Sequence, residues 1–288
     1  AFHEMVAIAE QALRKIKEGT PTEEIALIAP KHQILQAMAK ILHHYQIPVS
    51  YIRRKNLFDE QHLHELFTLL IFIDSMLQKG RDEADEILPE ILSFSFWGLK
   101  RLDVWKIATE AHRRRARNLW LEVMLESEHE KIRDIAKFFI VLAGEAKEKT
   151  AEEIIDYLTG AKSIDIDEVD KDQVGTLIRR AEFVCPFRDF YFSEAKFQHQ
   201  PAGYLNYLNA LKVFVQKIRE YKSRVVLQTR DVVEFIQLHQ KHKLPIFYED
   251  ELYSVTKGVN LLTAHGAKGL EFDTVFIMSA EDETWMSR

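Results

Sequence analysis

The residues best suited to chemistry gather in one short segment, Leu261–Phe272, close to the end of the printed sequence. The segment 259–263 has the β character of a buried strand, and such a strand would end at Thr263, two residues before His265. Ligands of open α/β sheets bind at the carboxyl ends of the strands. The sequence therefore predicts that Thr263 and His265 lie at a ligand-facing edge of a sheet.

The same segment carries groups that suit a phosphate-bearing ligand. Gly266 and Gly269 allow a phosphate or a neighbouring chain to approach the backbone closely. Lys268 offers a compact positive charge, and Glu271 can accept hydrogen bonds from ribose hydroxyls. By residue types alone, the segment is either a phosphate site or a glycine-containing turn without a binding role.

Length and composition set the scale of the fold around this segment. The 288 residues suggest two domains, at roughly 150 residues per domain. With 47% hydrophobic and 29% charged residues, the composition is that of an ordinary globular protein. Only ten glycines are present, which disfavours a turn-dense all-β fold and favours long helices. None of them is followed by Lys, so this sequence contains no Gly-Lys-Ser/Thr phosphate loop.

Charge and cysteine content exclude several classes of protein and site. The net charge of −6 argues against a globally basic nucleic-acid coat, although a local basic patch stays compatible with it. Cys185 is the only cysteine, which excludes an intrachain disulfide and fits a reducing, cytoplasmic setting. No apolar run approaches the ~18 residues that cross a membrane, and the start shows no signal-peptide pattern. We expect a cytoplasmic piece of a longer protein, without membrane spans.

Hydrophobic periodicity predicts the elements that position the segment. Residues 25–52 have the pattern of a strand, a helix and a strand, which is the spacing of a βαβ unit with parallel strands. Strand character returns at 259–263 and 274–278, after a long stretch in which helical periodicity dominates. The expected helices cover 2–18, 33–45, 60–78, 84–94, 101–112, 118–126, 129–148, 151–160, 203–221 and 230–243.

Four features that superficially suggest chemistry have simpler interpretations. Leu69–Asp74 mimics a Walker B strand, but the helical stripe runs through it. Asp165–Asp172 is expected to be an acidic turn, because it lacks the spacing of a calcium loop. His239 and His242 are expected on a solvated helix face. The aromatic residues of 183–192 are expected in a packing seam, with a base-stacking platform as the alternative.

The string Leu262–Phe272, followed by a Val-Phe-Ile strand, closely resembles motif V of the UvrD/Rep/RecB-like superfamily 1 ATP-dependent DNA helicases. That motif commonly reads Thr-x-His-x-(Ala/Ser)-Lys-Gly-Leu-Glu-(Phe/Trp), and every fixed position is matched here. Residues 23–30 resemble the opening strand of the family's second RecA-like domain. Residues 47–58 resemble its Ile-Pro, strand and Phe segment, although Arg53-Arg54 stands where the family often has Gly-Gly.

In this family the second RecA-like domain, called 2A, is interrupted by a helical domain called 2B. The resemblance implies an α/β fold in which a partial RecA-like parallel sheet is interrupted by a mostly α-helical insertion. The first part of 2A would cover 1–79, the 2B insertion 80–252, and the second part of 2A 253–288. Motif VI would lie beyond the last residue.

The resemblance also implies roles for the residues of motif V. Thr263 and His265 would contact the phosphate backbone of single-stranded DNA. Lys268, Gly269 and Glu271 would bind ATP, with Glu271 at the ribose. ATP and Mg²⁺ would be shared with the N-terminal RecA-like domain of the same parent chain, which carries the phosphate loop.

A second DNA contact is expected within the insertion. Ser95–Leu99 lies where the family places a Gly-Ile-Gly-like helix–turn–helix contact to duplex DNA, although only Gly98 is present here. Residues 97–121 carry a net charge of +5, the footprint expected of a phosphate contact. The alternative is a solvated basic helix face paired to the acidic stretch 122–130. The duplex-DNA candidates are Trp97, Gly98, Lys100, Arg101, Arg113, Arg114, Arg115 and Arg117.

The resemblance implies that the parent protein couples ATP hydrolysis to 3′-to-5′ movement on single-stranded DNA, in DNA repair or recombination. The fragment alone is expected to be inactive. Asp282 and Trp285 are similar to the RecB/AddA-like branch, which often carries a nuclease, so a nuclease domain or subunit is a further expected partner. One alternative is a non-catalytic, RecC-like DNA-binding scaffold in a helicase–nuclease complex. Another is a helical module that serves only protein interactions.

Overall fold

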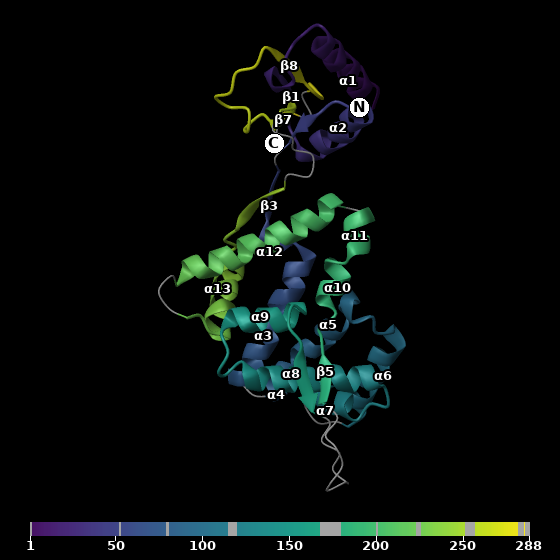
Figure 1. The fold of residues 1–288 in the computed structure, drawn as a ribbon, viewed down its shortest axis with the longest axis vertical. Coiled ribbons are helices and arrows are strands. Elements are labelled where there is room, and N and C mark those ends of the chain that lie inside the picture. Colours follow the sequence, from purple (N-terminus) through teal and green to yellow (C-terminus); the bar gives the residue numbers. More distant parts are fainter. Residues whose placement is uncertain are drawn as a thin grey trace. The chain divides into compact units, whose positions relative to one another are not determined.

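A computed structural model describes the two compact units into which the chain divides. The first unit consists of Ala1–Lys55 and Phe247–Arg288, and the second of Asn56–Ile246 (Figure 1). The described residues are 2–51, 53–78, 81–114, 120–167, 180–199, 201–222, 226–250, 257–281 and 285.

The first unit is built on a parallel sheet of four strands in the order β2-β7-β1-β8. The early strands are β1 (Ile25–Ala29) and β2 (Val49–Ser50), and the late ones are β7 (Val259–Thr263) and β8 (Thr274–Ile277). The two early strands do not pair with each other, because β7 lies between them. The sheet is therefore continuous only when both ends of the chain contribute to it.

Two amphipathic helices supply the core of the first unit. These are α1 (Phe2–Lys17) and α2 (His32–His44), whose apolar stripes recur every three to four residues. Leu35 and Met38 of α2 are fully buried with Leu27 of β1 and Leu261 of β7. A separate two-stranded sheet, β3 (Arg53–Asn56) with β6 (Phe247–Asp250), lies where the chain leaves the first unit and re-enters it.

The second unit is mostly helical. Its central helix is α3 (Gln61–Gln78), which is buried over most of its surface and packs against α8 (Glu130–Glu145) and α13 (Thr229–Lys241). The other helices are α4 (Arg81–Ala84), α5 (Leu88–Leu92), α6 (Arg101–Arg113), α7 (Trp120–Leu125), α9 (Ala151–Thr159), α10 (Phe187–Tyr191), α11 (Glu194–His199) and α12 (Pro201–Tyr221). An antiparallel hairpin joins β4 (Ile164–Asp167) to β5 (Arg180–Phe183).

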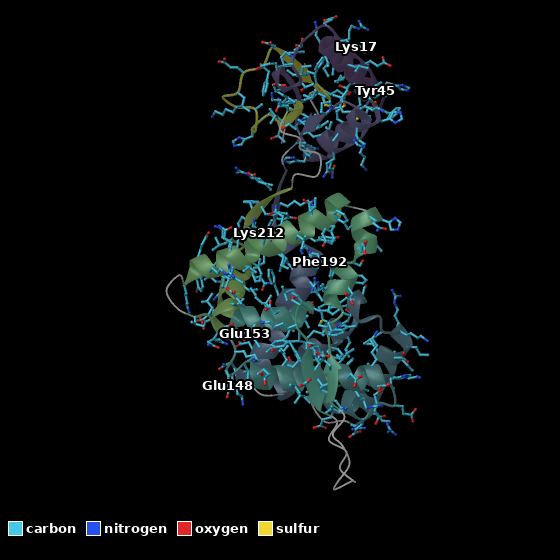
Figure 2. All side chains as sticks on the ribbon, viewed as in Figure 1. Lys17, Tyr45, Glu148, Glu153, Phe192 and Lys212 are labelled. Carbon is cyan, nitrogen blue, oxygen red and sulfur yellow. The ribbon has the colours of Figure 1, made fainter. Side chains whose placement is uncertain are left out.

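Local sequence explains where α9 begins and ends. The Thr150 hydroxyl accepts a hydrogen bond from the Glu153 amide at 3.3 Å, and the Thr150 amide donates to the Glu153 carboxylate at 3.1 Å. These two bonds between Thr150 and Glu153 (Glu153 is labelled in Figure 2) form a capping box at the start of α9. The helix stops at Gly160, whose φ of +75° is the left-handed conformation that favours glycine.

The mixed α/β architecture, a parallel sheet interrupted in sequence by a mostly helical unit, confirms the expected fold class. The boundaries between the units lie after Lys55 and after Ile246, whereas the sequence predicted them after residues 79 and 252. The reason is α3: its extensive apolar surface packs against α8 and α13 of the second unit, so it is not part of the first.

Several elements within the helical stretch were not expected. The helix expected at 84–94 is interrupted by a 3₁₀ turn at Asp85–Ile87, and α5 begins with Pro89 in its first turn, a position that suits proline. Asp165 lies in strand β4, so the interpretation as an acidic turn is wrong there, while 168–172 lies outside the described residues. No described helix is both long and apolar enough to cross a bilayer.

Candidate functional site

The motif V segment forms a hydrogen-bonded turn directly after β7. The Thr263 hydroxyl accepts a hydrogen bond from the Gly266 amide at 3.2 Å, and the Thr263 carbonyl accepts one from the Ala267 amide at 2.9 Å. A hydroxyl has one donor as well as its acceptor lone pairs. Thr263 can therefore shape the turn as an acceptor and still donate its O–H hydrogen to a ligand oxygen.

The side chains expected to bind ligands point into solvent. His265, Lys268 and Glu271 are all exposed. Gly269 has a φ of +84°, and an added Cβ would meet no atom within 4 Å. The backbone at Gly269 therefore needs the conformational freedom of glycine and leaves room for a bulky group such as a nucleotide to approach. These residues fit the expected contacts to ATP, because they offer an accessible cation, a carboxylate and open backbone on one turn.

The sheet places this turn at the edge where ligands of α/β folds bind. Thr263 pairs in register with Ala29, the last residue of β1, so both strands end at the same edge. At that edge the His32 Nδ1 lies 3.1 Å from the Tyr51 hydroxyl, which links the start of α2 to the end of β2. All five motif V candidates thus lie within one exposed turn at the carboxyl edge of a parallel sheet.

The duplex-DNA candidates around Gly98 divide into exposed and buried residues. Lys100 and Arg101 are exposed at the start of α6. Gly98 has a φ of +61°, and its added Cβ would lie 3.3 Å from the Nζ of Lys131, the second residue of α8. Lys131 is an exposed cation beside this turn that sequence reasoning missed, because it lies more than thirty positions away in the chain and no motif includes it.

Trp97 is a structural residue, and its assignment as a DNA contact is wrong. The side chain is 0% exposed. Its ring lies 4.6 Å from Phe96 and 5.7 Å from Phe139, measured between ring centroids. A fully enclosed indole cannot touch a phosphate or a base, so this residue supports the turn at Gly98 from inside.

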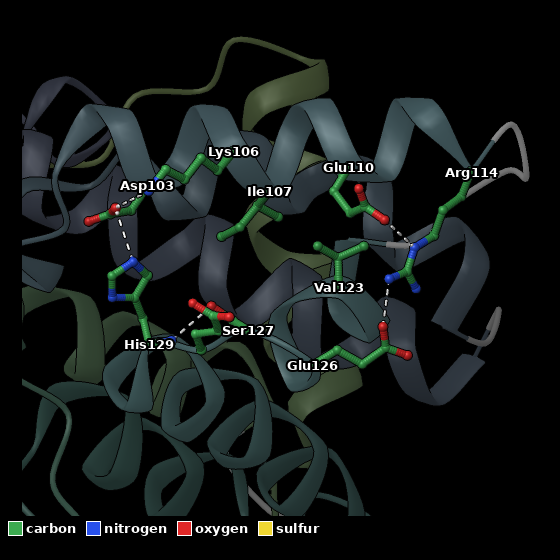
Figure 3. Close-up of a pocket in the computed structure, with 10 residues that line it drawn as sticks. Asp103, Lys106, Ile107, Glu110, Arg114, Val123, Glu126, Ser127 and His129 are labelled. Carbon is green, nitrogen blue, oxygen red and sulfur yellow. Dashed lines mark hydrogen bonds and ion pairs between the residues drawn. The ribbon is translucent and has the colours of Figure 1, made fainter.

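The basic residues at the end of α6 form ion pairs with acidic neighbours. The Arg114 Nε lies 2.9 Å from the Glu110 carboxylate, and the Arg114 Nη2 lies 2.6 Å from the Glu126 carboxylate (Figure 3). Hydrogen bonds from Arg113, then Arg114, lower the pKa of Glu110 to about 2. The pairing with the acidic stretch, weighed as the alternative, is what the structure shows for Arg114. Arg115 and Arg117 lie outside the described residues.

A pocket of about 410 Å³ lies between α6 and the connection from α7 to α8 (Figure 3). It is lined by four carboxylates, from Asp103, Glu110, Glu126 and Glu128, and by the cations of Lys106 and Arg114 together with His129. The His129 Nε2 lies 3.3 Å from Asp103. The pocket therefore has more carboxylates than cations, and its Arg114 is paired with two of them, Glu110 and Glu126. In the part of the chain that the structure describes, no three His, Cys, Asp or Glu side chains form a group suited to a metal ion.

The aromatic run near residue 190 is a packing seam, as expected. Phe187 is 0% exposed and Tyr191 4%. The Tyr191 hydroxyl donates to Glu65 at 2.7 Å, which brings a buried carboxyl group of α3 into the seam. Burial raises the pKa of Glu65, an effect that outweighs the hydrogen bond from Tyr191. Cys185 next to this seam is buried, and burial raises the pKa of its thiol to about 12, so it is unreactive in the folded state.

Glu65 gives the second unit a defined pH dependence. Because the pKa of Glu65 is raised in the folded state, the protonated carboxyl group stabilises the fold relative to the ionised one. This stabilisation is complete below the unfolded-state pKa of about 4.3 and is lost as the pH rises through the folded-state pKa. Glu65→Gln keeps an acceptor for Tyr191 without a charge, so the variant should melt at a higher temperature than the wild type at neutral pH and similarly near pH 4. Thermal unfolding across pH measures this. If the melting temperatures of wild type and Glu65→Gln changed with pH in parallel, the assignment of this pH dependence to Glu65 would be contradicted. Glu86→Gln, which replaces an exposed carboxyl group, serves as the control.

Comparison with known proteins agrees with the geometry. A family model described as the UvrD-like helicase C-terminal domain matches residues 2–286, which span both units. A search of curated proteins found no match. The family match includes the turn after β7, the parallel sheet and the helical unit. The chain therefore belongs to the UvrD-like helicase C-terminal domain family.

Proposed function

We propose that the chain is the part of an ATP-dependent DNA helicase that closes over ATP and grips single-stranded DNA, while a second domain of the parent protein supplies the phosphate loop. The observation that carries the proposal is the exposed turn after β7. It presents a hydroxyl and an imidazole together with a lysine, a left-handed glycine and a carboxylate, within nine residues at the carboxyl edge of a parallel sheet.

The two halves of the turn suit different ligands. The Thr263 hydroxyl and the His265 imidazole can donate hydrogen bonds to phosphate oxygens of a DNA strand. Lys268 suits the phosphates of ATP, and Glu271 suits its ribose hydroxyls. Bound Mg²⁺ would neutralise phosphate charge during hydrolysis. Because both ligands meet one short turn, closure around ATP would move the DNA contacts with it, which is the coupling that a translocating motor needs.

The parent would move 3′ to 5′ along single-stranded DNA in the cytoplasm, in repair or recombination, alone or with a nuclease domain or subunit. The 288-residue sequence lacks a phosphate loop of its own. Hydrolysis therefore requires the N-terminal RecA-like domain of the parent, and the isolated chain supplies binding groups only.

ATP hydrolysis tests the proposal. The isolated chain with ATP, Mg²⁺ and single-stranded DNA should hydrolyse no more ATP than a protein-free control, whereas the parent should show hydrolysis that rises with DNA. In the parent, Thr263→Val should raise the DNA concentration needed for half-maximal stimulation about tenfold, since a hydrogen bond to a charged group contributes ~1.5–3 kcal/mol. Thr263→Ser keeps the hydroxyl and should behave like the wild type.

Three results would contradict the proposal. Hydrolysis by the isolated chain would refute the division of labour between the domains. A parent that binds DNA but never hydrolyses ATP would instead be the non-catalytic scaffold. Equal behaviour of Thr263→Val and wild type, with both folded, would remove Thr263 from the DNA contact.

A further inference from the structure

Helix α6 has two different faces. Its inner face turns Asp103, Ile107 and Glu110 toward α7 and the start of α8 (Figure 3). At 100° per residue, Trp105 lies opposite this inner face and Leu102 lies toward the side of the helix, and their side chains are 63% and 60% exposed. These are large apolar side chains in water on a helix that is otherwise polar on this side. No ring of the described residues packs on Trp105.

The charges around Trp105 are positive. Arg101 flanks it on one side of the helix and Arg113 on the other, whereas Lys106 lies 3.9 Å from Asp103 and lines the pocket of the inner face. The two acidic residues of α6 are turned away: the Asp103 side chain is only 16% exposed beside His129, and Glu110 is held by Arg113 and Arg114. Lys100 and Arg101 form no ion pair within the described residues. The face thus places an accessible indole beside the exposed cations of Lys100 and Arg101 and beside Arg113, which is also paired with Glu110.

We propose that this face binds single-stranded DNA, with Trp105 stacked on an unpaired base and the cations, led by Arg101, on the neighbouring phosphates. The inference rests on the proposed DNA-dependent function and adds a contact site to it. Nucleic-acid bases stack on exposed aromatic rings, and surrounding Lys and Arg neutralise phosphate charge. Arg101 and Arg113 are twelve residues apart, ~18 Å along the helix, enough to follow several phosphates.

A protein partner fits this face less well. A stable protein interface buries about 800 Å² on each side around a cluster of apolar residues. Here two large apolar side chains, Leu102 and Trp105, stand among cations. A single planar ring within a positive border matches a polyanion with flat apolar faces, which is the chemistry of an unpaired nucleic-acid strand.

Binding of two fluorescein-labelled probes to the whole 288-residue chain tests the inference: a single-stranded oligothymidylate and a blunt duplex. Trp105→Ala should weaken binding of the oligothymidylate about tenfold, since stacking contributes ~1–3 kcal/mol per base, and should leave duplex binding unchanged. Trp105→Phe keeps a ring and should retain most of the affinity. Phe197→Ala removes an aromatic side chain that is 46% exposed on α11, a different helix of the same unit, and should change neither affinity.

Three outcomes would overturn the inference. The first is oligothymidylate binding that is absent in the wild type or unchanged in Trp105→Ala. The second is an equal loss for both probes, which would mean that the residue acts on phosphate contacts or on folding. The third is self-association of the wild type that Trp105→Ala abolishes without any change in DNA affinity, which would assign the face to a protein. Thermal unfolding verifies that each variant is folded.

Separate experiments test the stacking site and the proposed motor function, so one can be refuted without the other. If the parent hydrolyses ATP with DNA stimulation but Trp105→Ala binds oligothymidylate normally, only the stacking site is refuted. If the parent is inactive but Trp105→Ala still loses oligothymidylate affinity, the face binds DNA in a protein that is not a motor.

Discussion

Replacement of Gly160 by Ala is expected to destabilise the helical second unit by about 3 kcal/mol, the sum of backbone strain and steric overlap. An added Cβ would lie 2.1 Å from the carbonyl oxygen of Cys185 and 3.2 Å from its carbonyl carbon. Backbone cannot yield as a flexible side chain can, so the segment that leads into α10 must shift away from the end of α9. The left-handed φ of +75° adds ~1–2 kcal/mol for a residue with a Cβ.

The single cysteine provides the measurement for Gly160→Ala. Cys185 is buried with a raised thiol pKa, so alkylation in the native state requires opening of the second unit. The variant should be alkylated at much lower denaturant concentrations than the wild type. Gly98→Ala is the matched control in the same unit: its φ of +61° is equally left-handed, but its nearest neighbour is the flexible end of Lys131 at 3.3 Å. If Gly160→Ala and Gly98→Ala lost equal amounts of stability, the loss at Gly160 would come from the left-handed φ alone, and the close contact with Cys185 would add nothing to it.

Trp97→Ala is expected to reduce the stability of the second unit by ~3–5 kcal/mol, the range for removal of a large aromatic side chain from a core. Trp97 is fully buried between Phe96 and Phe139, and Phe139 in turn lies 4.9 Å from Phe72 of α3. The cavity would thus open next to the central helix. Denaturant unfolding, followed by circular dichroism, measures the loss.

Trp97→Phe separates the packing of this residue from its polar atom. Among the described residues the Trp97 Nε1 atom has no hydrogen-bond acceptor, and a buried unsatisfied donor costs ~1–3 kcal/mol. Phenylalanine removes that donor with part of the volume, so the variant should be clearly more stable than Trp97→Ala. Trp105→Ala, at an exposed position, should change stability by less than ~0.5 kcal/mol. If Trp97→Ala lost DNA affinity while keeping full stability, a direct contact would have to be reconsidered.

The sequence was most informative where chemistry and local periodicity coincide. The string from Thr263 to Phe272 predicted both the family and the turn after a strand, because each of its residues is constrained by type and spacing. The helices α1, α2 and α3 and the strands β1, β7 and β8 also lie close to their expected positions. Their apolar patterns are long or strongly buried, so local sequence determines them.

The features that sequence could not predict depend on contacts between distant residues. The hairpin β4–β5 pairs Ile164 with Phe183 across an intervening stretch of chain, and Lys131 reaches the turn at Gly98 from another helix. The burial of Trp97 could not be predicted from the sequence, because an aromatic residue near glycine and lysine is as compatible with a nucleic-acid contact as with a buried position. The same limit applied to α3, whose apolar character was evident although its packing partners were not.

The position of β7 between β1 and β2 has a consequence for the order in which the chain folds during synthesis. The ribosome completes residues 56–246 before it makes β7. The helical unit can therefore fold while the sheet still lacks β7, the strand between β1 and β2. Until Val259–Thr263 emerges, β1 and β2 have no strand between them, and their backbone groups there stay unpaired. Closing this sheet joins segments separated by more than two hundred residues, an entropic cost that a folded, compact insertion lowers by holding its own ends near each other. The insertion thus acts as an internal folding aid for the unit that it interrupts.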